Sequence, residues 1–358
     1  MGRDDPELAA AAADYVCVKV TDMRDVDVQN LRFDFDLTFA VLLMHSDGTV
    51  YHRYGSRGPD SADGYLSMTS LARLLRDTLP EHERYAANPA PPPAAPPRRA
   101  IEMPFLQRRL AAGQQIDCVH CHTVNTAQHD ELERGGSFDP EAIWVYPDPE
   151  RAGFTLDPER QRLVRAVRDD SPAAAAGLRI GDELVVLADV PVRTLADVQW
   201  ALHGLPSAAT KVAVRFRRGN GEDAERATEL SLPAGWKHCS PADYAWRSYK
   251  WNLSPAPGFG GPLLSTGEKE KLGLPADRFA LKVQYLVEWG EQAHRGRAAK
   301  AAGLRRGDIV VGYGDRDDFG SFPELFAWTA LTRTPGQRTD IVVLRQGKRV
   351  TLEFELPR

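Results

Sequence analysis

Two cysteines and a histidine in the middle of the chain have the types and spacing best suited to chemistry. Cys118 and Cys121 are three positions apart, and His122 directly follows the second cysteine. This order is typical of a covalently attached c-type haem, because each thiol can form a thioether with one vinyl group while the adjacent imidazole binds the iron. We therefore expect a haem c at these three residues, with electron transfer as its chemistry.

The same motif allows other interpretations. Two cysteines at this spacing can form half of a zinc site, which would need further ligands such as Cys17 or His129. They can also act as a redox pair, in which a thiolate attacks a substrate disulfide, or they can hold no cofactor at all. If a haem is bound, Met103 is the candidate sixth ligand, because it is the nearest methionine upstream of the motif.

Composition places the chain among soluble globular proteins of two or three domains. It has 358 residues, of which 27% are charged and 42% hydrophobic, and its formal net charge is -5. A weakly acidic chain does not predict binding to nucleic acid or to an anionic membrane surface. No apolar run is long enough to predict a membrane-spanning helix. Four cysteines are too few for a disulfide scaffold.

The polar, acidic start of the chain does not look like a signal peptide. Haem is normally attached covalently outside the cytoplasm, so the motif predicts a periplasmic or cell-envelope protein whose export signal lies outside the given sequence.

Elements that would flank the motif can be read from hydrophobic patterns. Residues 15–20 alternate and are rich in β-branched types, so they predict a strand with Cys17 in the core. Residues 39–44 and 49–54 predict a hairpin. A helix is expected to begin at residues 68–70, and shorter helices are expected at 6–13, 105–112 and 123–134. The Pro-rich stretch at 86–97 predicts an extended polyproline II spacer.

The second half of the chain contains an internal repeat. Residues 174–182 read AAAGLRIGD, and residues 300–308 read KAAGLRRGD. Each copy is followed by a short apolar strand, a helix at 195–202 or 322–328, and a terminal strand pair. The separation between the two copies, from residue 174 to residue 300, is the length of a whole domain, so it indicates a duplicated domain rather than a solenoid.

These copies resemble PDZ domains of the HtrA type. The resemblance rests on Ser-Pro-Ala-Ala-Ala-Ala-Gly-Leu at 171–178 with Gly181 and Asp182 behind it, and on LRQGK at 344–348 in the second copy. It implies that each domain binds a protein or peptide C-terminus as an added strand beside a helix. Residues 33–41 and 47–55 also resemble a bacterial family in which a thioredoxin-like domain is fused to PDZ domains, although no first strand with a redox cysteine pair precedes them.

The resemblance assigns peptide-binding positions in both copies. In the first copy the expected edge strand lies at 163–167, and in the second copy at 279–287. The loops expected to capture a carboxylate are Gly153, Phe154, Thr155 and Leu156 in the first copy, and Leu272, Gly273 and Leu274 in the second. The expected pocket residues are Leu195, Val198, Phe322 and Leu325, for which ordinary core packing is the alternative.

The sequence therefore predicts an α+β multidomain protein with a partial thioredoxin-like segment, a short helical motif region and two PDZ-type domains. The predicted boundaries are 1–85 for the thioredoxin-like segment, 86–99 for the Pro-rich linker, 100–150 for the motif region, 151–235 for the first PDZ domain, 236–270 for a Trp-rich connector and 271–358 for the second PDZ domain. The connector tryptophans Trp236, Trp246 and Trp251 are expected to hold the two domains together. No G-x-S-x-G, ordered triad, His-Glu-x-x-His or P-loop is present, so we do not predict a hydrolase.

Overall fold

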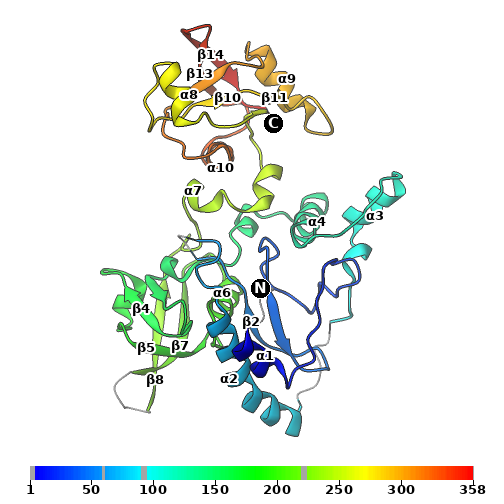
Figure 1. Ribbon diagram of the computed structural model, residues 1–358, viewed down its shortest axis with the longest axis vertical. Coiled ribbons are helices and arrows are strands. Elements are labelled where there is room, and N and C mark those ends of the chain that lie inside the picture. The colour runs from blue at the N-terminus through cyan, green and yellow to red at the C-terminus, as the bar shows by residue number, and fades with distance from the viewer. Residues whose placement is uncertain (1–4, 59–60, 90–94, 219–223, 358) are drawn as a thin grey trace. The chain divides into compact units, whose positions relative to one another are not determined.

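The computed structural model describes residues 5–58, 61–89, 95–218 and 224–357, which form two compact units (Figure 1). The first unit spans Met1–His238 and the second spans Cys239–Arg358. Within the described residues, no helix combines the length and apolar character needed to cross a membrane. The predicted boundaries at 85 and 150 both lie inside the first unit, and the smaller domains that they would delimit stay predictions.

A hairpin and a long helix form the amino-terminal part of the first unit. Strands β1 (Val41–Met44) and β2 (Val50–Tyr54) pair antiparallel, and α2 (Met68–Ala87) packs against them through an apolar face. Ser67 caps α2, so the helix begins where the sequence predicted. The short helix α1 (Pro6–Ala12) also matches its prediction. The thioredoxin-like resemblance stays a prediction, because these described residues supply only one hairpin and its helix.

The predicted strand at 15–20 is wrong. These residues belong to no strand, and Val16 and Val18 are 95% and 80% exposed. Cys17 is exposed as well and is not the core residue that the alternation suggested. Alternation favours an extended chain, but a strand also needs a partner to satisfy its main-chain groups, and none pairs with this segment among the described residues.

The motif region forms a small helical layer with its own apolar core. It contains α3 (Pro104–Ala111), α4 (Cys121–Arg134) and three single 3₁₀ turns, η1 (Ala100–Glu102), η2 (Pro140–Ile143) and η3 (Pro149–Arg151). Part of the predicted Pro-rich linker lies outside the described residues. Its last part is held by a hydrogen bond from Val28 N–H to Arg98 O, so residues before the hairpin pack with this region.

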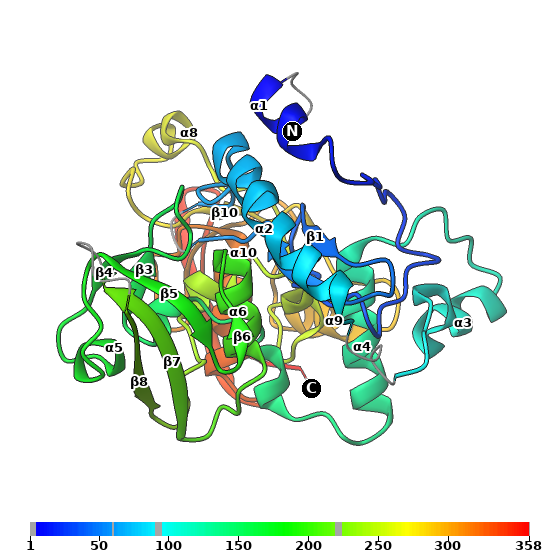
Figure 2. The same cartoon turned by 90° about the horizontal axis from the view of Figure 1, so that it is seen from below.

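The first repeat is built from two sheets and two helices. Strands β3 (Phe154–Leu156) and β4 (Val164–Val167) form a hairpin, and α5 (Pro172–Ala175) follows. The second sheet has the order β6-β5-β7-β8, and its strands are β5 (Asp182–Leu187), β6 (Val190–Pro191), β7 (Thr210–Arg218) and β8 (Glu225–Leu232) (Figure 2). Helix α6 (Leu195–His203) starts at a capping box made by Thr194 and Asp197.

The second unit has a sheet of the order β10-β12-β13-β14, in which β12, β13 and β14 pair as β5, β7 and β8 do. The fourth strand differs, because β10 precedes β12 in the chain whereas β6 follows β5. Its elements are α7 (Pro241–Tyr244), η4 (Ser248–Asn252), β9 (Phe259–Gly260), α8 (Thr266–Lys271), β10 (Leu281–Lys282), β11 (Tyr285–Leu286), α9 (Ala293–Ala301), β12 (Ile309–Tyr313), α10 (Phe322–Thr332), β13 (Arg338–Arg345) and β14 (Lys348–Glu355).

The repeated Gly-Leu-Arg-x-Gly-Asp sequence makes the same local contacts in both units. Asp182 accepts a hydrogen bond from Arg179 N–H and an ion pair from Arg218, whose guanidinium also donates to Gly177 O. In the second unit Asp308, Arg305, Arg345 and Gly303 make the corresponding four-residue arrangement. Each aspartate therefore ties the turn before a central strand to the end of the neighbouring strand.

Tryptophans of the predicted connector belong to separate units. Trp236 is part of the core of the first unit and donates its indole N–H to Pro206 O at 2.9 Å. Trp251 packs within the second unit, with its ring centroid 5.8 Å from that of Phe322.

Candidate functional site

Strand β3 has one main-chain edge that no described strand covers. Gly153 O accepts a hydrogen bond from Arg168 N–H, and Asp157 N–H donates to Leu163 O, so both residues face β4. Alternate residues of a strand direct their main-chain groups to opposite edges. Phe154 and Leu156 therefore turn their N–H and C=O groups away from β4, toward the edge that an added strand would use.

The prediction that residues 163–167 form the edge strand is wrong. Strand β4 has partners on both sides, because it pairs with β3 and is also joined to β5. Leu184 N–H donates to Arg162 O, and Gly181 N–H donates to Val164 O. The edge without a strand partner belongs to β3 itself, whose residues were predicted to be part of the carboxylate loop.

Predicted site residues of the first repeat do come together. Phe154, Leu156, Leu195 and Val198 belong to one apolar cluster, and each is at most 2% exposed. Thr155, between the two β3 residues, is partly buried. The structure thus places β3 and the start of α6 on the same core, while a role of these side chains in binding a ligand stays a prediction.

A buried charged network holds the beginning of α6 to the amino-terminal hairpin. His52 lies between two carboxylates, with Nδ1 2.8 Å from Asp197 Oδ2 and Nε2 2.7 Å from Glu81 Oε2. Burial alone would lower the pKa of His52, but the two carboxylates outweigh it and raise this pKa to about 9. Arg193 also pairs with Glu81. This network was not predicted from the sequence, because its members are far apart in the chain.

The predicted residues of the second repeat are placed differently. Leu272, Gly273 and Leu274 form the turn that ends α8, and strand β10 begins only at Leu281. The range 279–287 contains two short strands, of which β11 pairs with β9 as β4 pairs with β3. The expected single edge strand is absent, because residues 283–284 between β10 and β11 belong to no strand.

Helix α10 of the second unit carries Phe322 and Leu325 as predicted, but only Leu325 is fully buried. Phe322 stacks on Trp251, and Trp251 also makes an edge contact with Phe326 at 4.9 Å between ring centroids. The 3₁₀ turn η4 thereby covers one face of α10.

The cysteine motif lies at the start of α4. Cys121 is the first residue of this helix, His122 is the second, and Cys118 precedes it in an exposed position. All four cysteines of the chain are free thiols, and burial raises the pKa of the Cys121 thiol. The rings of His120 and His122 are stacked 5.4 Å apart. Two thiols and an accessible imidazole in this order fit the donor set of a covalently held haem.

Met103, the candidate sixth ligand, is 1% exposed and packs in the apolar core of the motif region with Val119 and Leu106. Packing accounts for its side chain, so its role as a ligand stays a prediction. In the part of the chain that the structure describes, no three His, Cys, Asp or Glu side chains are grouped to hold a metal ion. Of the proposed additional zinc ligands, Cys17 is exposed and His129 is buried against Phe138.

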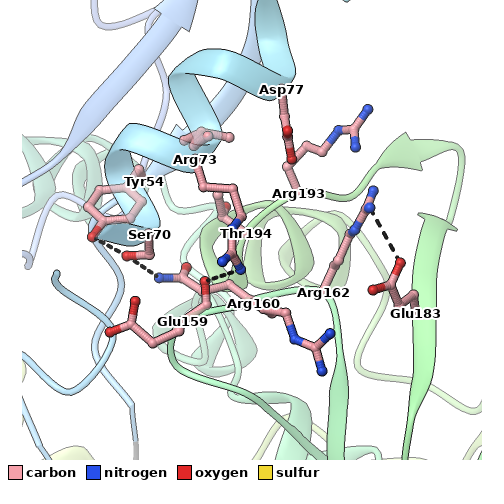
Figure 3. A pocket seen from close by; sticks show the side chains of 12 residues that line it. Tyr54, Ser70, Arg73, Asp77, Glu159, Arg160, Arg162, Glu183, Arg193 and Thr194 are labelled. Carbon is pink, nitrogen blue, oxygen red and sulfur yellow. Dashed lines mark hydrogen bonds and ion pairs between the residues drawn. The ribbon is translucent and has the colours of Figure 1, made fainter. Parts of the chain in front are cut away.

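A cavity of about 180 Å³ is lined by α2 and by loops of the first repeat (Figure 3). Arg162 points toward Glu183, at 3.3 Å, and Arg73 donates to Glu159 O. Basic and acidic groups thus alternate around this cavity, and its charge does not select an anion or a cation.

Comparison with known proteins agrees with the arrangement of the first repeat. A family model described as PDZ domain matches residues 151–230. No curated protein matches the chain.

Among solved structures, the chain is similar to the HtrA-type protease AlgW with a decapeptide, at 17% identity and a TM-score of 0.24, over 43% of this chain and 51% of that chain. A variant of that protease with a tripeptide is 24% identical, with a TM-score of 0.23, over 36% of this chain and 39% of that chain. The chain thus spans about half the length of these structures or less. Residues 151–230 of this protein form a PDZ domain.

Proposed function

We propose that the PDZ domain binds the C-terminal segment of a partner protein as a strand added to β3. The observation that carries this proposal is the free edge of β3, where the main-chain groups of Phe154 and Leu156 face away from β4. An added strand would gain affinity from these main-chain groups. The apolar cluster shared by β3 and α6 favours a ligand with an apolar side chain at its end.

Binding can be tested on the full chain with an array of random decapeptides that carry either a free carboxylate or a C-terminal amide. We expect the free-acid peptides with an apolar last residue to bind, and the matching amides to bind at least about tenfold more weakly because a charge-assisted contact is lost. Hydrogen exchange should slow at residues 154–157 and 195–203 and stay unchanged in β8. Slower exchange confined to β8, or equal binding of acids and amides, would contradict the proposal.

We infer that the second unit is a further PDZ-type domain. Support comes from the pairing order of β12, β13 and β14, which matches that of β5, β7 and β8, and from the pairing of β9 with β11. The arrangement around Asp308 also repeats the one around Asp182. Its peptide edge would be β9, not the predicted edge strand at 279–287. Peptide-dependent slowing of exchange in β9 and α10 would support this assignment, and its absence with peptides that bind β3 would limit binding to the first domain.

A second candidate function is electron transfer through a haem c. We propose that Cys118, Cys121 and His122 hold it, because the motif is accessible at the start of α4 and Cys118 and His122 are exposed. The bound haem would supply one-electron exchange, and the PDZ domain would hold a partner nearby. This proposal also implies a periplasmic or cell-envelope location. Zinc binding and thiol–disulfide exchange are the alternatives for the same residues.

The haem proposal is tested by the reduced absorption spectrum in alkaline pyridine of chain exported together with a cytochrome maturation system. We expect a sharp band that survives acid–acetone extraction, is lost when Cys118 and Cys121 are both replaced by serine, and is kept in Cys17→Ser. Colourless protein would overturn the proposal, and zinc analysis and a disulfide-reduction assay would then separate the alternatives.

A further inference from the structure

The edge of β3 that no described strand covers is in contact with another part of the same chain. Tyr65 Oη donates a hydrogen bond to Leu156 O at 2.9 Å. The ring of Tyr65 packs against the apolar cluster that contains Phe154, Leu156 and Leu195. Because Leu156 O faces the edge that an added strand would use, the Tyr65 hydroxyl engages an acceptor that a peptide ligand would need.

Tyr65 is fixed from its main chain as well as from its side chain. Gln161 Nε2 donates to Tyr65 O at 2.7 Å, and Gln161 Oε1 accepts from Leu195 N–H at 3.2 Å. Gln161 therefore bridges Tyr65 to the first residue of α6. Gly58 lies directly on the tyrosine ring, since a Cβ at this position would be 2.6 Å from Tyr65 Cε2.

The segment that contains Tyr65 also makes hydrogen bonds along α6. Arg53 N–H donates to Asp197 Oδ1 at 2.9 Å, and the Thr194 hydroxyl donates to Arg53 O. Gln199 Nε2 donates to Arg57 O at 3.3 Å. Strand β2 and α6 lie side by side in Figure 1, as these hydrogen bonds require. Residues on both sides of the expected peptide position are thus engaged by one stretch of the amino-terminal part.

We propose that the segment made of residues 53–58 and 61–67 acts as an internal strap, which occupies the peptide site of the PDZ domain through Tyr65 and keeps external peptides out. This inference rests on the proposed peptide-binding function and concerns its regulation. A ligand could bind only the fraction of molecules in which Tyr65 has left β3, so its apparent affinity is reduced by that fraction. The partner that opens the site would be a peptide with an aromatic or large apolar residue, since the site already accommodates a tyrosine ring.

Variants of the full chain test the strap. Tyr65→Phe removes only the hydroxyl, and Tyr65→Ala also removes the ring. The matched control is Tyr15→Phe, because the Tyr15 hydroxyl likewise donates to a main-chain oxygen, Leu75 O at 2.7 Å, but away from β3. The probe is the random decapeptide array with free carboxylates, and circular dichroism confirms that each variant is folded.

We expect Tyr65→Phe to bind peptides about fivefold more tightly than the unmodified chain, as the loss of one hydrogen bond implies, and Tyr65→Ala to bind them at least about tenfold more tightly. Tyr15→Phe should leave affinity unchanged. If the unmodified chain and both Tyr65 variants bind peptides equally well, the strap is overturned while peptide binding stands. If folded Tyr65→Ala binds no peptide at all, the peptide-binding function itself fails and the strap fails with it.

Discussion

The imidazole of His52 and the carboxylate of Asp197 are 2.8 Å apart and almost completely buried, although 145 positions separate them in the sequence. Asp197 belongs to the first turn of α6, where it also caps the helix. A side chain of the amino-terminal hairpin is therefore fixed to the helix that borders the proposed peptide site. This contact couples the stability of the first unit to the protonation of His52.

We predict that the first unit loses stability as pH rises above neutrality. The pKa of His52 is raised from 6.5 to about 9 in the folded chain, so its stabilisation is complete below pH 6.5 and disappears as pH rises through 9. The free energy of unfolding should fall by on the order of 3 kcal/mol over this range. Urea unfolding at a series of pH values measures it.

His52→Gln should abolish this pH dependence and lower stability at pH 6. His82→Gln is the control, since that imidazole makes a hydrogen bond only to the hydroxyl of Tyr51 among the contacts that the structure describes. An unchanged slope in His52→Gln would show that another group titrates.

Asp182→Asn should destabilise the first unit by about 2 kcal/mol, because the nearly buried carboxylate holds both Arg179 N–H and the Arg218 guanidinium. Asp308→Asn should do the same to the second unit only. Hydrogen exchange in β7 and β13 under mild denaturant reports on the two units separately. Glu229→Gln, which breaks an exposed ion pair with Lys211, should change stability by less than about 0.5 kcal/mol. Equal effects of Asp182→Asn on both units would contradict the assignment.

Alanine substitutions at two glycines with positive φ distinguish the energetic cost of backbone strain from that of steric crowding. Gly153 has φ +95°, and a Cβ there would be 2.1 Å from Ser171 Cβ, whereas Gly177 has φ +76° and open space around it. Gly177→Ala should therefore cost about 1 kcal/mol of strain, and Gly153→Ala about 3 kcal/mol or more. Denaturant midpoints measure both. Similar losses for the two variants would mean that Ser171 and its helix shift easily.

Trp251→Ala should destabilise the second unit by about 2 kcal/mol, because the indole packs on Phe322 and Phe326. Trp289, which is 56% exposed against 39% for Trp251, provides the control, and its replacement by alanine should cost less than about 0.5 kcal/mol. Thermal unfolding of each variant gives the comparison. A larger loss of stability in Trp289→Ala would show that the contact of Trp289 with Tyr285 contributes more to stability than the packing of Trp251 on α10.

Local sequence determined many of the elements and a turn motif that occurs in both units. Helices α4, α6 and α10 and the strand pairs β7–β8 and β13–β14 lie where their patterns predicted them. The Gly-Asp turns around Asp182 and Asp308 depend on residues within a few positions, so the same short motif folds in the same way in both units. Such features depend on periodicity, caps and turn residues, all of which are local.

Only the tertiary structure decided which strands pair and which distant residues form hydrogen bonds with one another. Strand β4 could not be recognised as an internal strand from its own residues, because its second neighbour, β5, lies beyond α5. Val16 and Val18 alternate like a strand but meet no partner among the described residues. The contacts of Tyr65 with Leu156 and of His52 with Asp197 join residues 91 and 145 positions apart. No local pattern encodes these pairs, because hydrogen bonds between distant residues exist only once the packing of whole elements has brought them together.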